Sequence, residues 1–441
     1  MGIPVALLIT IGVSALAQAP ALAQAPDEAT ITEAYVYLLG RALVIRQEQT
    51  DLAEKGIAYN TIKYNPLGSA DFVNPNLDVA YLEAWFAVDD KTPVVLEVPE
   101  VTGRYYTAQI MDEWGEVIAN INERTFPTRP FGKFLLVKPG SKVETPPGAG
   151  RIELHSSKAK MLARVERKGD DAGALRLQKA FKVNATGEPA IEKPVAIPTF
   201  NNKDLIGVEV FERAGPILAS ALDVAPNAAQ MQQKVHAVAG HVASGPEARA
   251  AVDALLRGKV IPEFKVFATT KAAPYRNHWL GGGSSGNYGA NYRLRTMVNL
   301  MGIWGNTGEE AVYFGAFRDA DEQPLDGAKS YVIHFPAGGL PESVVNAYWS
   351  IILVGVPDYR VVANSLKRYN LNNQSPLQKE ADGSLKIGIG PKPVAGVPES
   401  NWLPSDPAKP FSLTFRTYVP KEVVLREWAP PPVTLVHEEA R

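Results

Sequence analysis

Short strands separated by turn residues are the feature that most constrains the fold of this chain. The runs 93–100 (PVVLEVPE), 104–112 (RYYTAQIMD) and 133–138 (KFLLVK) are rich in β-forming residues, and clusters of Gly, Pro and Asn separate them. Runs of the same kind, rich in β-forming residues, occur again at 311–317, 329–335, 348–356, 385–389 and 411–419. Regular short strands are typical of a sandwich or barrel. The sequence therefore predicts a mainly β protein with two β units and a helical insertion.

Helical periodicity marks the segments between and before these units. Apolar residues recur at spacings of three and four over 30–49, and the Ala-rich region 205–258 predicts helices at 208–222, 228–243 and 247–256. A further helix is predicted over 291–304, where apolar and cationic residues alternate in a helical pattern. The polar, Pro-containing tract 167–202 predicts a linker or a surface excursion. We expect an N-terminal helix over 24–58, a first β domain over 59–200, a helical subdomain over 201–304 and a second β domain over 305–441.

The beginning of the chain resembles a secretory signal. Residues 4–17 (PVALLITIGVSALA) form an uncharged apolar run, and small residues follow it. This run is shorter than the roughly 20 residues that span a bilayer as a helix. We expect cleavage after Ala23, export to the periplasm and no membrane anchor in the mature protein. The absence of Cys fits that compartment, where free thiols are oxidised.

Composition excludes several classes of function. The chain has 45 basic and 47 acidic side chains in 441 residues, a net charge of -2, and 46% of its residues are hydrophobic. It has no long basic run, so nucleic acid is not an expected partner. With no Cys, disulfides, thiolate metal sites and Cys nucleophiles are excluded.

One polar cluster in the first β domain could carry chemistry. Asp78 or Asp112 is a candidate base, and Tyr81 or Arg104 could stabilise developing negative charge. Period-two alternation places Arg104 and Asp112 on one face of the strand 104–112. The candidate catalytic residues are Asp78, Tyr81, Arg104 and Asp112, and the candidate substrate-binding residues here are Asn76, Tyr106 and Gln109. The structural alternative is that Asn76 and Asp78 cap a turn and that Arg104 forms a rim ion pair.

A second cluster near the C-terminus combines aromatic and polar side chains. Trp349, Arg368 and Trp402 are candidate substrate-binding residues, because Trp faces stack on planar or sugar-like ligands while polar groups bind their edges. The same residues also build ordinary β-sandwich cores with satisfied polar corners. The sequence leaves both interpretations open.

Nucleophile and metal motifs are weak in this chain. Residues 282–286 (GGSSG) fit the G-x-S-x-G template around Ser284, but no buried apolar strand precedes them, and a flexible loop is the commoner meaning of such a run. The six His residues lack metal-ligand spacing. The sequence predicts no metal site and indicates no particular cofactor; a metal bound by residues far apart in the chain stays an alternative.

Several motifs resemble one bacterial family. NPNLDVAY, GRYYTAQIMD and RTFPTRPFGKFLLVKPG in the first half, and AYWS, VANSLKRY, DGSLKIGIGPKP, NWLP and FRTYVPKEVVLREWAPPPV in the second, are similar to the DUF1254/DUF1214 proteins and occur in the same order. The resemblance implies an immunoglobulin-like β-sandwich, a small helical subdomain and a jelly-roll-like C-terminal β domain. It implies no catalytic residues, since fold alone does not give function.

Two functions are expected from these observations. The first is an exported enzyme of hydrolase or lyase type, acting on a small exogenous molecule in a cleft between the two β domains, because domain junctions favour pockets. The alternative is a periplasmic ligand-binding or scaffolding protein without chemistry. The expected partner is a small-molecule ligand or substrate, and assembly into a homo-oligomer is left open.

Overall fold

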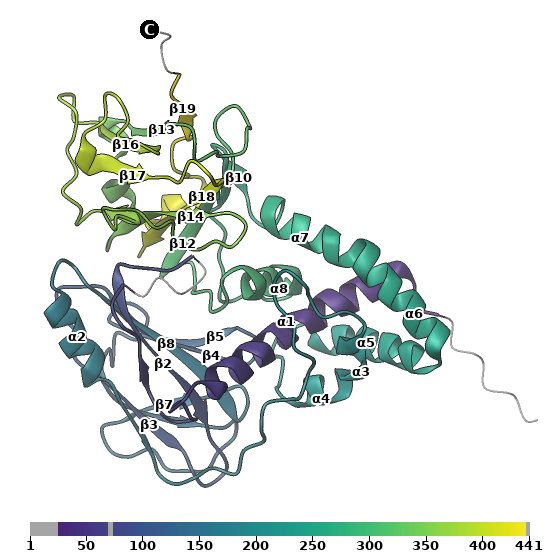
Figure 1. Ribbon diagram of the computed structural model, residues 1–441. Coiled ribbons are helices and arrows are strands. Elements are labelled where there is room, and N and C mark those ends of the chain that lie inside the picture. The colour runs from purple at the N-terminus through teal and green to yellow at the C-terminus, as the bar shows by residue number, and fades with distance from the viewer. Residues whose placement is uncertain (1–24, 69–73, 438–441) are drawn as a thin grey trace, which may run out of the picture.

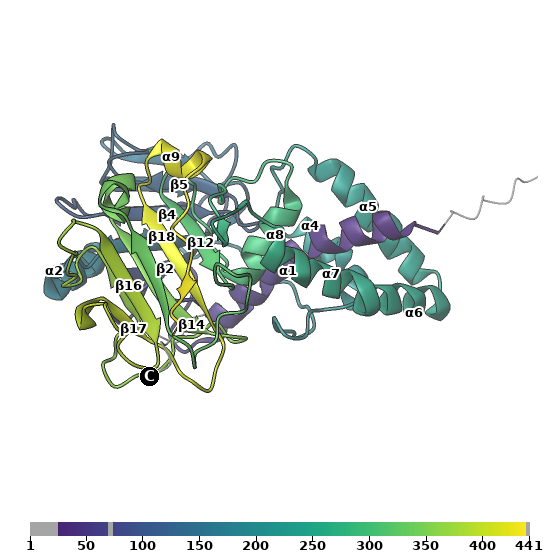
Figure 2. The same cartoon turned by 90° about the horizontal axis from the view of Figure 1, so that it is seen from above.

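The computed structural model describes residues 25–68 and 74–437, and it is mainly β with a helical layer. Two β units lie one above the other, and the helices pack along one side of the pair (Figure 1). Figure 2, seen from above, places the strands of the C-terminal unit over those of the first unit, with the helices beside both. The predicted mainly β fold with helices is confirmed; the immunoglobulin-like and jelly-roll-like topologies stay predictions. The predicted signal segment lies outside the described residues.

Helix α1 (Glu28–Ala53) connects the helical layer to the first β unit. Asp27 caps it by accepting a hydrogen bond from the backbone N–H of Thr30 at 2.8 Å. Most of its length is buried, including the charged Arg41 and Glu48. It packs against α5 (Ala228–Ala243) and α8 (Tyr292–Met301), so it is a central element of the protein and not a peripheral arm.

The first β unit consists of two sheets around one core. One sheet has the order β1-β2-β8-β4-β5 and the other the order β7-β6-β3-β9. Their strands are β1 (Lys63–Tyr64), β2 (Val79–Ala87), β3 (Val94–Val98), β4 (Tyr106–Met111), β5 (Val117–Ile121), β6 (Gly132–Val137), β7 (Gly150–Glu153), β8 (Lys158–Glu166) and β9 (Lys182–Ala185). Because side chains alternate along a strand, β8 directs Met161, Ala163 and Val165 into this core. Its Lys160 and Arg164 therefore lie on the opposite face.

The expected linker over 167–202 is wrong in its first half. Helix α2 (Asp171–Ala180) and strand β9 occupy it, and β9 pairs with β3. Asp170 caps α2 by accepting from the backbone N–H of Gly173 at 2.8 Å. A polar surface helix with few buried side chains leaves little apolar periodicity to detect, which explains why the sequence reads as loop.

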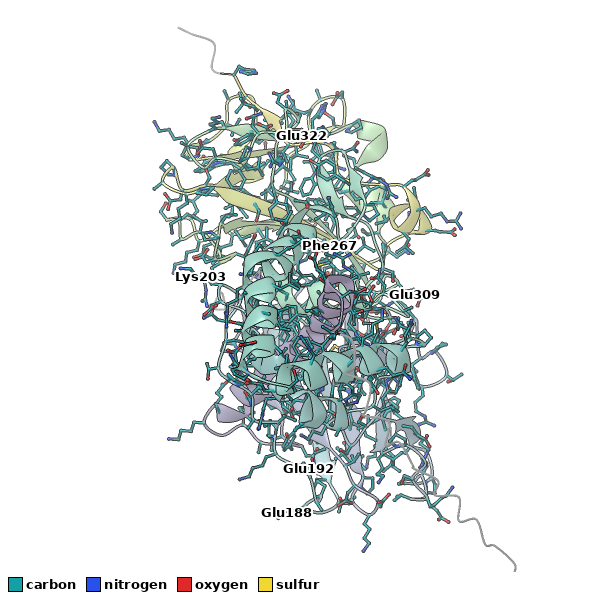
Figure 3. All side chains as sticks on the ribbon, turned by 90° about the vertical axis from the view of Figure 1, so that its right-hand side faces the viewer. Glu188, Glu192, Lys203, Phe267, Glu309 and Glu322 are labelled. Carbon is teal, nitrogen blue, oxygen red and sulfur yellow. The ribbon has the colours of Figure 1, made fainter. Side chains whose placement is uncertain are left out.

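The helical layer continues from residue 209 to 301. It contains α3 (Glu209–Glu212), α4 (Ala214–Ala219), α5, α6 (Pro246–Leu255), the π-helical turn η1 (Leu256–Val260), α7 (Ile261–Thr270) and α8. Figure 3 faces this layer, with the C-terminal unit that carries Glu322 above it and the first unit, near Glu188 and Glu192, below. In the part of the chain that the structure describes, no helix has both the length and the apolar character to cross a membrane.

The second β unit also has two sheets around a shared core. One has the order β10-β11-β12-β18-β14-β15 and the other β17-β16-β13-β19. Their strands are β10 (Tyr275–Arg276), β11 (Trp279–Gly281), β12 (Ala311–Ala316), β13 (Tyr331–Phe335), β14 (Trp349–Gly355), β15 (Asn370–Asn372), β16 (Leu385–Gly390), β17 (Trp402–Pro404), β18 (Phe411–Tyr418) and β19 (Thr434–Leu435). Short helical turns accompany them: η2 (Ala337–Gly339), η3 (Pro341–Val344), η4 (Glu399–Asn401) and α9 (Glu422–Arg426).

A buried ion cluster joins α8 to the first β unit. Arg295 is 1% exposed and donates from both terminal nitrogens to the carboxylate of Asp223, at 2.8 Å each. It also donates to Glu116 at 3.3 Å, in the turn after β4. A buried charge of this kind is tolerated only while its partners are in place.

Replacement of Arg295 should therefore destabilise the protein strongly. Arg295→Met leaves two buried carboxylates without their cation, and we expect a loss of about 3–5 kcal/mol in the free energy of unfolding. Urea denaturation at pH 7 measures it. The control is Arg426→Gln, which removes an exposed pair with Glu422 and should change stability by less than about 1 kcal/mol. Equal losses in the two variants would contradict this role of the cluster.

Candidate functional site

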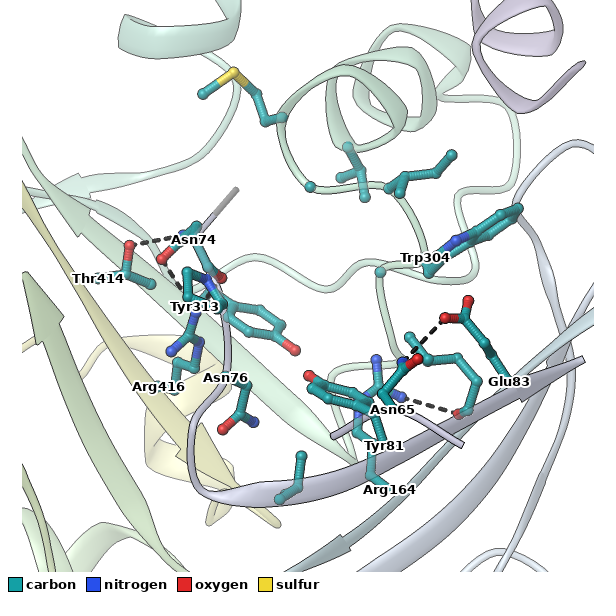
Figure 4. Close-up of a pocket in the computed structure, with 18 of the residues that line it drawn as sticks. Asn65, Asn74, Asn76, Tyr81, Glu83, Arg164, Trp304, Tyr313, Thr414 and Arg416 are labelled. Carbon is teal, nitrogen blue, oxygen red and sulfur yellow. Dashed lines mark hydrogen bonds between the residues drawn. The ribbon is translucent and has the colours of Figure 1, made fainter. Parts of the chain in front are cut away.

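Polar side chains from both β units converge on a cavity of about 380 Å³ between them (Figure 4). Its floor is the outward face of β2 and β8 in the first unit, and a second wall comes from β12 and β18 of the C-terminal unit. Helix α8 and the residues after it close a third side with Met297, Val298, Met301, Ile303 and Trp304. The cavity thus exists only because the two units and the helical layer meet there.

Strand alternation decides which side chains face this cavity. Tyr81 and Glu83 of β2 point out of their own core, as do Leu162 and Arg164 of β8. On β18, Leu413 and Phe415 enter the C-terminal core, whereas Thr414, Arg416 and Tyr418 line the cavity. Two sheets therefore present their polar faces to each other.

One end of the cavity holds a closed ion network. Lys160 donates to Glu83 at 2.6 Å and to Asp51 of α1 at 2.8 Å. Burial alone would raise the pKa of Glu83, but the charge and hydrogen bond of Lys160 outweigh it and hold this pKa below its usual value. The ammonium of Lys160 also lies 5.3 Å from the ring centroid of Trp85 and 5.8 Å from that of Trp304. The carboxylates at this end are thus already neutralised.

The other end holds two buried arginines with neutral partners. Arg164 is 4% exposed and donates to the amide oxygen of Gln109 at 2.5 Å, and Gln109 in turn donates to the carbonyl of Gly305 at 2.8 Å. Arg416 is 3% exposed and donates to the backbone carbonyl of Asn74 at 2.7 Å. Its other terminal nitrogen, Nη1, is buried without a partner among the described residues.

Tyrosines stand between these arginines. The hydroxyls of Tyr81 and Tyr313 point toward one another in the close-up, between Arg416 and Arg164 (Figure 4). The guanidinium of Arg164 lies 5.6 Å from the ring centroid of Tyr81. Burial raises the pKa of Tyr81, with Arg164 acting in the opposite direction, so its phenol is a neutral proton donor at pH 7.

Of the residues expected to be catalytic, only Tyr81 lines this cavity. Asp78 faces a separate hollow of about 220 Å³, where Asn370 and Asn372 each donate to its Oδ1 at 2.6 Å. Burial raises the pKa of Asp78. Arg104 lies at the rim of a third hollow and pairs with Asp170 at 2.8 Å. The structure thus does not bring the four residues together.

Asp112 is buried in the turn after β4 and does not line the cavity. Its Oδ1 accepts from the backbone N–H groups of Trp114 and Glu116, and its Oδ2 lies 2.7 Å from Nδ1 of His155. These contacts fix the turn between β4 and β5. Asp112 is therefore a structural carboxylate in this arrangement.

Of the residues in the first β unit expected to bind substrate, Asn76 alone lines the cavity. Asn76 lines the cavity and donates to the hydroxyl of Tyr418, and Gln109 lies behind it as the support of Arg164. Tyr106 points into the core of the first unit, and its hydroxyl donates to the carbonyl of Pro130 at 2.8 Å. The face of β4 assigned from alternation to a pocket is thus the core face, and the opposite face carries Gln109.

The C-terminal cluster is structural throughout. Trp349 stacks on Phe415 inside the second core, with ring centroids 5.5 Å apart. Trp402 donates to the carbonyl of Gly390 at 2.9 Å, and Arg368 donates to the carbonyl of Trp402 at 3.0 Å. Of the two interpretations left open by the sequence, the structure favours the core.

The structure also bears on the Ser284 motif and on the possibility of a metal site. Ser284 is exposed on its loop, and its neighbour Ser285 lines the cavity with its hydroxyl donating to the carbonyl of Asn306 at 2.7 Å. Among residues 25–68 and 74–437, no group of three or more His, Asp or Glu side chains is arranged to hold a metal ion.

Sequence reasoning missed Arg164, Tyr313, Trp304 and Arg416. A signal for Arg164 does exist, because KAKMLARVE alternates charged with small or apolar residues as a strand with one core face does. The second face of such a strand is usually solvated, and here another domain covers it. That covering depends on contacts between segments far apart in the chain.

Two family models cover the two β units. The model of the DUF1254 family, described as a protein of unknown function, matches residues 57–185, and that of the DUF1214 family, described in the same words, matches residues 310–422. The chain is a DUF1254/DUF1214 domain-containing protein. The cavity thus lies where the DUF1254 and DUF1214 parts meet the helices between them.

A solved structure shares the fold of this DUF1254/DUF1214 protein. The VPA0106 protein from Vibrio parahaemolyticus is 20% identical, with 93% of this chain and 100% of that chain covered and a TM-score of 0.67. A protein from Burkholderia cenocepacia is 12% identical over 90% of this chain and 87% of its own, with a TM-score of 0.45, too low to support an argument. No curated protein matches the chain. These similarities concern the fold alone.

The Asp112–His155 pair predicts a pH-dependent effect of one substitution. The hydrogen bond that His155 donates to the carboxylate of Asp112 raises the pKa of His155. Its stabilising contribution is therefore complete below the pKa of an unfolded histidine, about 6.5, and is lost as the pH rises through the higher folded value. Asp112→Asn should lower the free energy of unfolding more at pH 5.5 than at pH 9 in urea denaturation.

His155→Gln serves as the control for this measurement, because it removes the titrating ring and leaves the backbone contacts of Asp112 in place. In a protein that carries His155→Gln, the further substitution Asp112→Asn should lower the free energy of unfolding equally at pH 5.5 and at pH 9. An Asp112→Asn loss that is equal at both values, or greater at pH 9, would show that the pair does not titrate in this way.

Proposed function

We propose that the protein takes a small organic molecule into the cavity between its two β units and acts on it there. The observation that carries the proposal is the cavity itself, which combines apolar walls from α8 with a few converging polar groups from both units. Its volume of about 380 Å³ is within the range of small-molecule sites, and such sites favour domain junctions.

Of the two reaction types considered, the lining residues favour a lyase-type proton transfer. Tyr81 presents a protonated hydroxyl beside Arg164, and this pairing suits a proton donor that also stabilises negative charge. No His is among the described residues that line the cavity, and its Ser285 is hydrogen-bonded to a backbone carbonyl. A hydrolase with a His-activated serine is thus less well supported.

Binding without chemistry is the second candidate. Among the described residues that line the cavity, the carboxylates are those of Asp51 and Glu83. Both are held by Lys160, so neither is a free base. A site with a proton donor and no available base can retain a ligand without turning it over. The distinction between the two candidates is whether a bound compound is consumed.

Consumption of compounds from a mixture tests this proposal. The purified protein is incubated with esters, glycosides and aromatic acids, and both loss and retention of each compound are followed by mass spectrometry. Met301→Trp narrows the cavity and should abolish both, whereas Val266→Trp, at an exposed position of α7, should abolish neither. Turnover that survives Met301→Trp would place the reaction elsewhere.

Tyr81→Phe separates the two candidate functions. It removes one hydroxyl and keeps the ring, so it should retain the ligand and lower turnover by about 10²–10⁴-fold if Tyr81 transfers a proton. Retention without consumption in the wild-type protein would favour the binding function. Unchanged turnover in Tyr81→Phe would remove Tyr81 from the chemistry.

We further propose that the protein is exported to the periplasm. The support is the uncharged run 4–17 with the small residues after it. Expression of the full chain in a Gram-negative host should give a periplasmic protein that begins at Gln24, as measured by N-terminal sequencing and intact mass. A cytoplasmic product that keeps Met1 or Gly2 at its N-terminus would contradict export.

A further inference from the structure

Positive and negative side chains are paired at one end of the cavity and not at the other. At the α1 end, Lys160 pairs with Asp51 and Glu83, and Lys63 pairs with Glu54. Every charged group there has a partner of opposite sign. The excess positive charge is therefore confined to the opposite end, where Arg164 and Arg416 lie.

Among the described residues, the hydrogen-bond partners of both arginines are neutral groups. Arg164 donates to Gln109 and to the carbonyl of Leu162, and Arg416 to the carbonyl and side-chain oxygens of Asn74. Transfer of an ionised group out of water costs several kcal/mol, and neutral acceptors offset only part of that cost. The buried, unpartnered Nη1 of Arg416 is a direct sign of this shortfall.

One acidic group acts on the charge of Arg416, and that group is Asp78. It influences Arg416 through space, but its Oδ1 accepts two amide hydrogen bonds from Asn370 and Asn372 in a separate hollow. No ion pair joins it to either arginine within 4 Å. Asp78 therefore reduces the positive potential at this end and does not neutralise it.

Apolar side chains form the adjoining wall. Met297, Val298, Met301 and Ile303, from α8 and the residues after it, line the cavity opposite the polar floor. Phenol hydroxyls of Tyr81 and Tyr313 stand between the arginines as additional hydrogen-bond donors (Figure 4). A ligand that matches this arrangement has an anionic group at one end and an apolar body.

We propose that the molecule bound in this cavity is an organic acid whose carboxylate lies between Arg164 and Arg416 and whose apolar body packs on α8. The inference rests on the proposed use of the cavity and names the ligand class. Arginine suits the role because its planar fork binds carboxylates through paired, charge-assisted hydrogen bonds. Tyr81 then contacts the same head group.

Matched acid and alcohol probes test the inference. Octanoate and 3-phenylpropanoate are compared with octan-1-ol and 3-phenylpropan-1-ol by isothermal titration calorimetry on the full-length protein or its exported form. Each acid should bind at least about 10-fold more tightly than its alcohol, corresponding to about 1.4 kcal/mol. Octyl phosphate is included to separate carboxylate from phosphate recognition, and tighter binding of it would overturn the carboxylate assignment.

Gln109→Glu is the sharpest variant, because Gln109 lies behind the cavity and does not line it. The substitution places a carboxylate beside Arg164 and removes the hydrogen bond that Gln109 donates to the carbonyl of Gly305. It should remove the preference for acids, and the affinity for the alcohols, measured in the same variant, shows whether the lost bond has altered the cavity. Arg164→Gln and Arg416→Gln should have the same effect, and Arg164→Lys should keep part of the preference. Arg368→Gln is the control, since this arginine binds carbonyls outside the cavity.

The outcomes separate this inference from the proposed function. Alcohols that bind as tightly as acids, with binding blocked by Met301→Trp, would overturn the acid class and keep the cavity as the site. Acid binding that survives both Gln109→Glu and Met301→Trp would overturn the inference by placing the acid elsewhere. If no probe binds, the inference fails, and the fate of the wider mixture then decides the proposed function.

Discussion

The covered polar face of the sheet β2-β8-β4 is the constraint on which the rest of the structure depends. One face of this sheet forms the core of the first β unit, and the other carries Glu83, Lys158, Lys160 and Arg164 beneath α1, α8 and the second β unit. Charges removed from water need partners at close range. Those partners come from distant segments: Glu48 and Asp51 of α1 bind Lys158 and Lys160.

This requirement explains why the helical layer and both β units act as one structure. Helix α1 supplies carboxylates to the sheet, α8 supplies Arg295 to Asp223 and Glu116, and β18 brings Arg416 against the Asn74 segment. Each of these contacts holds one part of the chain against another. The cavity is the space that these contacts leave open. Its two arginines, Arg164 and Arg416, carry positive charges that neutral hydrogen-bond acceptors offset only in part.

The sequence predicts the elements well and the site only in part. Runs of β-forming residues locate β3, β4 and β6 and five of the ten strands of the C-terminal unit, β12, β13, β14, β16 and β18, because each of these strands has an apolar face in a core. Asp78 lies at a bend just before β2, outside the strand whose alternation brings Tyr81 to the cavity, and the two side chains reach different cavities. Arg104 and Asp112 lie at opposite ends of β4, and each finds a local partner. Arg416 and Trp304 carry no local signal, because only tertiary packing brings them to the cavity.

The most direct measurement is a crystal structure of the protein with 8-bromooctanoate, in which anomalous scattering locates the bromine and the electron density locates the carboxylate. The account predicts a carboxylate within hydrogen-bonding distance of Arg164 and Arg416, with the bromine end of the chain against Met301 and Ile303. A bromine signal in the hollow beside Asp78, on the surface, or with the carboxylate at the Lys160 end of the cavity would contradict it.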